Sequence, residues 1–177
     1  MIYASYLQGD KKASERQYLS VEANDKLNHL ARYFGVLTGK VSTRDFMEKI
    51  RTDKNQVCLD IIETLLVANL QKEAVSLIEM LQTHEPLIFS LSAIYADIKG
   101  GSPNDSATEG IAFPSRRIEM NCLSHWAKQG SQKAQLLLGC ALYAKGHYEK
   151  AVALWEGLSS TDYRAARNLA VAYYSHM

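Results

Sequence analysis

Acidic residues and histidines at close spacing are the natural starting points for acid–base chemistry in this sequence. Asp60 and Glu63 are three residues apart, so on a helix their carboxylates would share one face and could act as a pair. Like charges at this spacing are far more often a solvated helix face, which is the interpretation we favour. Glu119 and His125 are six residues apart, which turns a helix through about 600°, so they would point about 120° apart. They would not cooperate directly, and we expect His125 at the surface or in an interface.

Histidine and cysteine spacing shows no metal-binding pattern. The five histidines include no pair at i,i+4 spacing and no HExxH motif. Cys58, Cys122 and Cys140 are far apart and form no CxxC motif. Each lies in an apolar helical context, where a free thiol packs as a small hydrophobic side chain. We therefore expect no metal or other cofactor and no disulfide, in a reducing compartment.

Composition argues against several other classes of function. The chain has 177 residues, 47% hydrophobic and 22% charged, which is ordinary for one soluble globular domain. Its net charge of +1 and its small basic patch of Arg116, Arg117 and Lys128 predict no nucleic-acid partner. Gly100-Gly101 lacks the Lys-Ser/Thr of a phosphate-binding loop. No apolar run is long enough for a transmembrane helix, so we expect no membrane partner.

The strongest pattern is a motif that recurs five times: an apolar residue, a second apolar or small residue, and a large apolar one four positions after the first. The intervals between successive motifs are 31, 30, 47 and 31 residues. A period of about 30 to 35 residues is typical of helix-pair repeats, which bury their apolar faces against their neighbours. The motifs begin at Leu30, Ile61, Leu91, Leu138 and Leu169. The sequence thus predicts an all-α fold, a right-handed α-solenoid of about five helical hairpins.

The repeat between Gln135 and Leu158 is the best preserved. Gly139 lies on its first helix, where the missing side chain would let the partner helix approach closely. Gly146 stands where that helix must end in a left-handed turn, which glycine adopts without strain. Tyr148, Ala151, Trp155 and Leu158 then follow one face of a second helix. These positions resemble the tetratricopeptide (TPR) pattern, with Leu142 in place of its tyrosine and Trp155 in place of its phenylalanine.

The same template predicts where other helices begin. Ser42 to Asp45 has the pattern of a capping box for a short helix that carries Phe46. Pro86 would be the first residue of the helix that carries the third motif, a position where proline's missing N–H costs nothing. Ser115 would cap the helix that follows the longest interval.

That longest interval is about 16 residues too long, and the excess forms a loop at about 100–114. Its Gly, Pro, Asn, Asp and Ser residues are typical of turns. A loop of this length is often functional or disordered, whereas a tolerated surface insertion costs little extra closure entropy. We favour the insertion, and we expect Phe113 to dock onto the helices.

The order of the motifs and the place of the loop have a parallel in a known family. The segments concerned are Lys26–Phe34, His84–Ile88, Ala112–Arg116, Leu138–Tyr143, Ala151–Glu156 and Arg167–Tyr174. Together they resemble the TPR region of large bacterial proteins that also carry a domain of unknown function and are often linked to carbohydrate metabolism. The resemblance covers about residues 12–177. It implies a single TPR-like helical repeat domain over 1–177, a bacterial, cytoplasmic and non-catalytic part of a longer protein, and it transfers no catalytic residue.

The ends of the chain fit that expectation. The first twenty residues look like a damaged repeat, and the last repeat has only one helix, from Tyr163 to about Met177. Solenoids usually carry a polar capping helix at each end. Tyr173 and Tyr174 in the last turn suggest instead that the natural protein continues or that two chains pair as a homodimer through these ends.

In TPR-like stacks the first helix of each pair lines a concave groove. Residues two before, two after and five after the start of each motif would therefore point inward. The candidate binding residues chosen by this rule are Asn28, Arg32, Glu63, Leu66, Phe89, Tyr143, Arg167 and Tyr174. The same rule also selects Leu136, Cys140 and Val171. The lysine and asparagine set that grips a terminal carboxylate in chaperone-binding relatives is absent, although Arg32, Arg164 and Arg167 could hold an acidic group.

The groove predicts a protein–protein interaction or scaffold module. Its ligand would be a peptide, a partner protein or the chain's own missing N-terminal domain. The same residues could instead simply cover the inner surface or pack an adjoining domain. The main alternative is an accessory segment of a carbohydrate-active or sugar-binding bacterial protein, with Tyr143, Tyr174 and Arg167 nearest to a sugar site.

Overall fold

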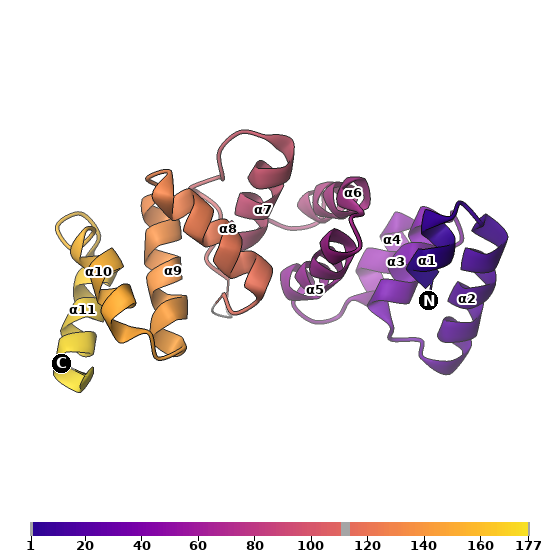
Figure 1. Ribbon diagram of the computed structural model, residues 1–177. Coiled ribbons are helices and arrows are strands. Elements are labelled where there is room, and N and C mark those ends of the chain that lie inside the picture. The colour runs from indigo at the N-terminus through magenta and orange to yellow at the C-terminus, as the bar shows by residue number, and fades with distance from the viewer. Residues whose placement is uncertain (1, 111–113, 177) are drawn as a thin grey trace. The chain divides into compact units, whose positions relative to one another are not determined.

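The computed structural model describes residues 2–110 and 114–176 of the chain (Figure 1). Within these residues the regular structure is eleven α-helices, with one isolated β-bridge, which confirms the predicted all-α class. None of these helices combines the length and the apolar character needed to cross a membrane. The helices fall into two compact units, Met1–Leu87 and Ile88–Met177, which are described separately. The TPR-type solenoid and the single repeat domain stay predictions.

The first unit contains six helices. They are α1 (Ile2–Leu7), α2 (Lys11–Asn24), α3 (His29–Leu37), α4 (Thr43–Lys49), α5 (Lys54–Val67) and α6 (Gln71–Gln82). Four of them begin after a polar N-cap whose side-chain oxygen accepts a hydrogen bond from the N–H three residues later, which satisfies a free amide of the first turn. The four caps are Asp10, Asn28, Ser42 and Asp53.

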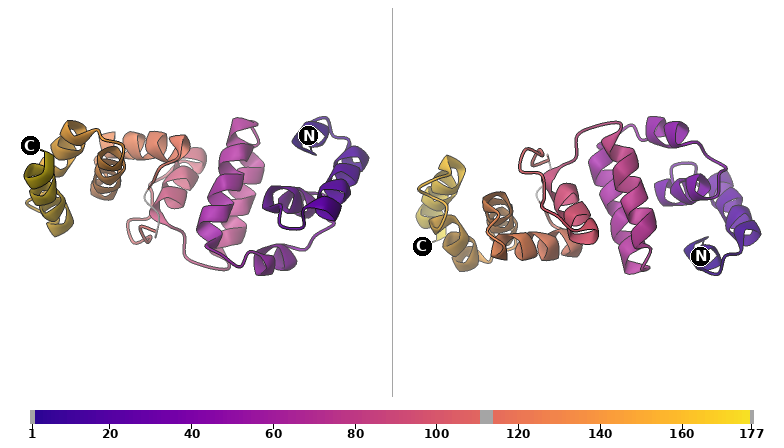
Figure 2. Two further views of the ribbon diagram at one scale, coloured as in Figure 1. Left: turned by 90° about the horizontal axis from the view of Figure 1, so that it is seen from below. Right: turned by 90° about the horizontal axis from the view of Figure 1, so that it is seen from above.

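Helix pairs and aromatic side chains hold the first unit together. Figure 2 shows α5 and α6 lying side by side, and α3 packs against both α2 and α4. Tyr33 on α3 is fully buried, and its hydroxyl donates to the Glu73 carbonyl on α6 at 2.6 Å. Tyr6 on α1 donates to the Glu73 carboxylate at 3.0 Å. The start of α6 is therefore a common anchor for α1 and α3.

The second unit contains five helices. They are α7 (Phe89–Lys99), α8 (Arg117–Lys128), α9 (Gln132–Ala144), α10 (Tyr148–Glu156) and α11 (Tyr163–His176). Each packs against the next along the chain. Helices α9 and α10 approach each other closely where Gly139 faces Trp155, and the Trp155 indole N–H donates to the Leu136 carbonyl at 3.3 Å. Trp155 is buried, so this contact fixes the distance between the two helices.

Two of the predicted helix boundaries are confirmed, and two are wrong. Ser42 accepts from the Asp45 N–H at 3.0 Å, and Gly146 has a φ of +79°. Pro86 does not start a helix, because the extended Ile88 bridges Thr108 and α7 begins only at Phe89.

Ser115 is not the N-cap of α8, which is Arg116. The reason lies with Glu119, whose carboxylate accepts from both the Ser115 and the Arg116 N–H, at 3.1 and 3.2 Å. This acceptor moves the start of the helix one residue further along the chain.

The described part of the long loop is fastened to the helices rather than structureless. The Phe89 N–H donates to the Thr108 carbonyl at 2.6 Å, and the Asn104 N–H donates to the Ser92 hydroxyl at 2.7 Å. Lys133 on α9 donates to the carbonyl of Asp105 at 2.9 Å and also to that of Ala107. These contacts bind residues 104–108 to α7 and α9. The expected docking of Phe113 lies outside the described residues.

Candidate functional site

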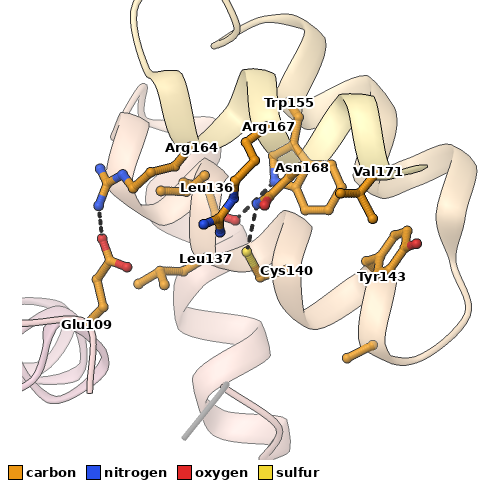
Figure 3. A pocket seen from close by; sticks show the side chains of 11 residues that line it. Glu109, Leu136, Leu137, Cys140, Tyr143, Trp155, Arg164, Arg167, Asn168 and Val171 are labelled. Carbon is orange, nitrogen blue, oxygen red and sulfur yellow. Dashed lines mark hydrogen bonds and ion pairs between the residues drawn. The ribbon is translucent and has the colours of Figure 1, made fainter. Parts of the chain in front are cut away.

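A groove of about 480 Å³ lies between α9 and α11 in the second unit. Its apolar lining consists of Leu136, Leu137, Cys140, Tyr143, Ala144, Trp155 and Val171. Its polar lining consists of Glu109, Arg164, Arg167 and Asn168. Figure 3 looks into the groove and shows Glu109 reaching Arg164 at one end and Tyr143 at the other.

Helical periodicity brings these side chains to one place. Leu136, Cys140 and Tyr143 follow each other at four and three residues, so they share one face of α9. Arg164, Asn168 and Val171 have the same spacing on α11, with Arg167 next to Asn168. Both helices are held in place by a core that includes Trp155, Ala165 and Leu169. The groove is therefore formed by two rigid helix faces.

Arg164 is a neutralised charge at one end of the groove. Its guanidinium donates to the Asp162 carboxylate through Nε at 3.0 Å and through Nη2 at 2.6 Å. It also pairs with Glu109 from the long loop. The hydrogen bond from Arg164 lowers the pKa of Asp162, which keeps that carboxylate charged. Arg164 is thus committed to two acids of its own chain, contrary to the expectation that it could hold an acidic ligand.

Arg167 differs from Arg164. It is exposed at the groove and has no hydrogen bond or ion pair with any described residue. Its neighbour Asn168 donates through Nδ2 to the Cys140 sulfur at 3.4 Å. Arg167 is therefore the groove's one charge left unpaired by the described part of the chain.

Cys140 forms part of the apolar floor rather than a reactive centre. Burial is the main cause that raises its pKa, and the charge of Glu109 adds to the effect. The thiol is consequently protonated near neutral pH, whereas a nucleophilic cysteine requires a lowered pKa. Among the described residues that line the groove, none is a nucleophile with a lowered pKa.

Tyr143 closes the other end of the groove and belongs to an aromatic cluster. Its ring centroid lies 5.0 Å from that of Tyr148 and 5.6 Å from that of Trp155. His176, in the last turn of α11, stacks on Tyr148 at 3.8 Å. Such contacts hold the half-buried Tyr143 ring in one orientation beside the groove.

The inward register predicted from the repeats places several residues together in the second unit. Tyr143 and Arg167 both line the groove, as do Leu136, Cys140 and Val171. Tyr174 does not line it and is 94% exposed. Phe89 is fully buried beneath Lys133, whose ammonium lies 5.6 Å from the ring centroid, so it cannot contact a ligand.

The other four predicted residues lie in the first unit. Asn28 accepts from the Ala31 N–H at 2.9 Å as the cap of α3. Arg32 is only 3% exposed and donates to Glu22 at 2.9 Å and to Asp45 at 2.7 Å. This corrects the expectation that Arg32 faces a ligand, because its guanidinium instead ties α2 and α4 to α3. Glu63 and Leu66 are half-buried on α5.

Sequence reasoning missed five groove residues: Glu109, Leu137, Ala144, Asn168 and Trp155, the last of which was expected only to pack between helices. Leu137, Ala144 and Asn168 each directly follow a residue that the inward rule selects or that lines the groove, so a wider face would have included them. Glu109 could not have been found this way, because it lies 55 residues from Arg164 in a segment outside the repeat pattern.

The other groups considered for chemistry are structural or solvated. Glu119 is 2% exposed, and its carboxylate accepts hydrogen bonds from backbone N–H groups at the start of α8. His125 is half-exposed, as expected. Its Nε2 lies 3.8 Å from Asp97 Oδ1, and its ring lies edge-on to that of Trp126.

Comparisons with protein-family models, with curated proteins and with solved structures found no match to this chain. The α9–α11 groove therefore has to be interpreted from its own geometry.

Proposed function

We propose that this chain is a non-catalytic interaction module whose α9–α11 groove binds a segment of a partner protein. The observation that carries the proposal is an apolar floor beside Arg167, an arginine that pairs with no residue in the described part of the chain. Grooves that recognise peptides combine apolar pockets with a few fixed polar groups in this way. Two helix faces held by a common core provide a preorganised surface, which limits the entropy lost on binding.

The alternative of a sugar site has less support from the groove than a peptide site. That interpretation combined Tyr143 and Tyr174 with Arg167, but Tyr174 does not line the groove. A peptide segment with apolar side chains matches the groove better, because most of the residues that line the groove are apolar.

Display of random peptides on phage, with selection on the full chain, tests the proposal. Val171 lines the groove and is 51% exposed, so Val171→Trp would fill the groove without changing charge. We expect selected peptides to lose binding to this variant. Val67→Trp is the matched control, because Val67 is 83% exposed on α5 of the first unit and is not among the residues that line the groove.

Peptides that bind the native chain and Val67→Trp alike, but not Val171→Trp, would support a peptide-binding groove. A selection that yields no binders, or binders that Val171→Trp retains in full, would contradict it. Far-UV circular dichroism of each variant shows whether the helices are intact.

A further inference from the structure

The charges of the groove specify what its occupant must carry. Three charged side chains line it: Glu109, Arg164 and Arg167. Glu109 and Arg164 pair with each other, and Arg164 also pairs with Asp162. Arg167 is left without a partner among residues 2–110 and 114–176. An occupant complementary to this groove therefore carries one negative charge beside Arg167.

The apolar floor of the groove indicates which other side chain the ligand must carry. Leu136 and Leu137 are buried at its base, at 2% and 3% exposed, and Val171 on α11 adds an accessible apolar side chain that is 51% exposed. Cys140 adds an uncharged thiol to the same lining, and the charge of Arg167 acts on that thiol. An aliphatic or aromatic side chain placed on this floor would remove apolar surface from water, which stabilises the complex. The acid and the apolar group must lie close together, because Arg167 and Val171 are one helical turn apart.

The remaining donors show that a single carboxylate is expected. Asn168 uses one amide N–H on Cys140, and the Trp155 N–H is used on the Leu136 carbonyl. Among the described residues that line the groove, Arg167 carries the one unpaired charge, and one guanidinium matches one carboxylate through two parallel N–H···O bonds. A chain terminus would bring a carboxylate that is commonly held by several converging backbone donors, and the groove offers no such set among its described residues.

We infer that the groove recognises an internal segment of a partner protein in which a Glu or Asp side chain lies within a few residues of a large apolar side chain. This inference rests on the proposed function and adds the chemistry of the ligand. Arg167 binds the acid, and the floor formed by Leu136, Leu137, Cys140 and Val171 receives the apolar group.

The test uses the peptides selected on the full chain, resynthesised with acetylated and amidated ends so that they carry no terminal carboxylate. We expect an acid to recur at one position near an apolar residue. Replacing that acid by its amide, or introducing Arg167→Glu, should weaken binding roughly ten- to hundredfold, because a charge-assisted hydrogen bond is lost. A peptide with lysine in place of the acid should regain binding to Arg167→Glu. Arg117→Glu is the control, since Arg117 is exposed on α8 and lies outside the groove.

The outcomes separate this inference from the proposed function. Peptides that lose binding to Val171→Trp but show no recurring acid and tolerate Arg167→Glu would overturn the inference and leave the groove as a binding site. Peptides that require a free terminal carboxylate would also overturn it. If every selected peptide binds Val171→Trp as well as the native chain, the proposed function itself is contradicted.

Discussion

Gly139 and Trp155 show how a single residue sets the distance between two helices. A Cβ atom at position 139 would lie 2.8 Å from Trp155 Cε2, closer than packed atoms tolerate. Trp155 cannot move away easily, because it is 2% exposed and its N–H is bonded to the Leu136 carbonyl. The glycine is required here for close packing and not for a special backbone conformation.

We therefore expect Gly139→Ala to destabilise the second unit by about 1–3 kcal/mol, the usual effect of overpacking. The free energy of unfolding in urea, followed by tryptophan fluorescence, measures this. Gly157→Ala is the matched control, because its Cβ would meet only the Leu154 carbonyl oxygen at 3.7 Å. A Gly139→Ala variant that is no less stable than Gly157→Ala would show that Trp155 has room to shift.

His29 gives the first unit a dependence on pH. Burial is the main cause that lowers its pKa below the ordinary 6.5, and the charge of Arg32 adds to the effect. As the first residue of α3, it also lies at the positive end of a helix. The unfolded chain therefore takes up a proton more readily than the folded one, and stability falls as pH falls through the ordinary pKa.

We expect His29→Gln to remove part of this loss. The native chain should lose more stability than His29→Gln when the pH is lowered from about 7.5 to about 5.5. Urea unfolding followed by circular dichroism at both values gives the comparison, with the exposed His147→Gln as control. Equal losses in the native chain and in His29→Gln would show that His29 is protonated as easily in the folded state as in the unfolded one.

At the scale of elements, the long loop is tied to the helices by a few polar contacts. Lys133 donates to two loop carbonyls, and Glu109 pairs with Arg164. Both ties come from the helices that form the groove, α9 and α11. The position of the loop is thus coupled to the same helices that would bind a ligand.

Removal of the Lys133 tie should loosen the loop without unfolding the helices. We expect Lys133→Met to increase the rate of proteolysis within 100–110 several-fold, because two backbone carbonyls lose their donor. Lys145→Met, at an exposed position beyond the end of α9, should leave the rate unchanged. Unchanged proteolysis of Lys133→Met, measured by mass spectrometry of the fragments, would show that other contacts hold the loop.

The repeat pattern explains which parts of these elements could be predicted. Local spacing predicted the helices that carry the five motifs and several residues that share a face of α9 or α11, because helical periodicity depends only on neighbours in sequence. It failed for Arg32, since Glu22 and Asp45 come from two other helices and bury its guanidinium. It failed for Pro86, since the bridge from Ile88 to Thr108 delays the start of α7. Contacts between segments distant in sequence leave no periodic signal.

At the scale of the whole molecule, the two compact units can be followed by different spectroscopic probes. The chain has two tryptophans, Trp126 and Trp155, and both lie in the second unit. Circular dichroism reports the helices of both units. Because each unit has its own buried residues, we expect them to unfold separately.

Arg32→Ala tests this expectation. Loss of its two ion pairs should destabilise the first unit by about 1–3 kcal/mol, with Glu22 and Asp45 still partly solvated. The midpoint of unfolding measured by circular dichroism should fall, while the midpoint of unfolding measured by tryptophan fluorescence, which reports the second unit, should stay unchanged. Arg44→Ala, which removes a solvent-exposed pair with Glu48, should leave both midpoints where they are. Equal shifts of both midpoints in Arg32→Ala would show one cooperative transition.

The contact between Glu109 and Arg164 also bears on the order in which the second unit folds. Its helices contact their immediate successors in the chain, whereas this ion pair spans 55 residues. Contacts between close neighbours form quickly, and closure of a longer loop is slower because it costs more chain entropy. Helices α9, α10 and α11 would therefore assemble first, and Glu109 would pair with Arg164 on a finished surface. The contact that completes the wall of the groove would then form after the two helices that carry its floor.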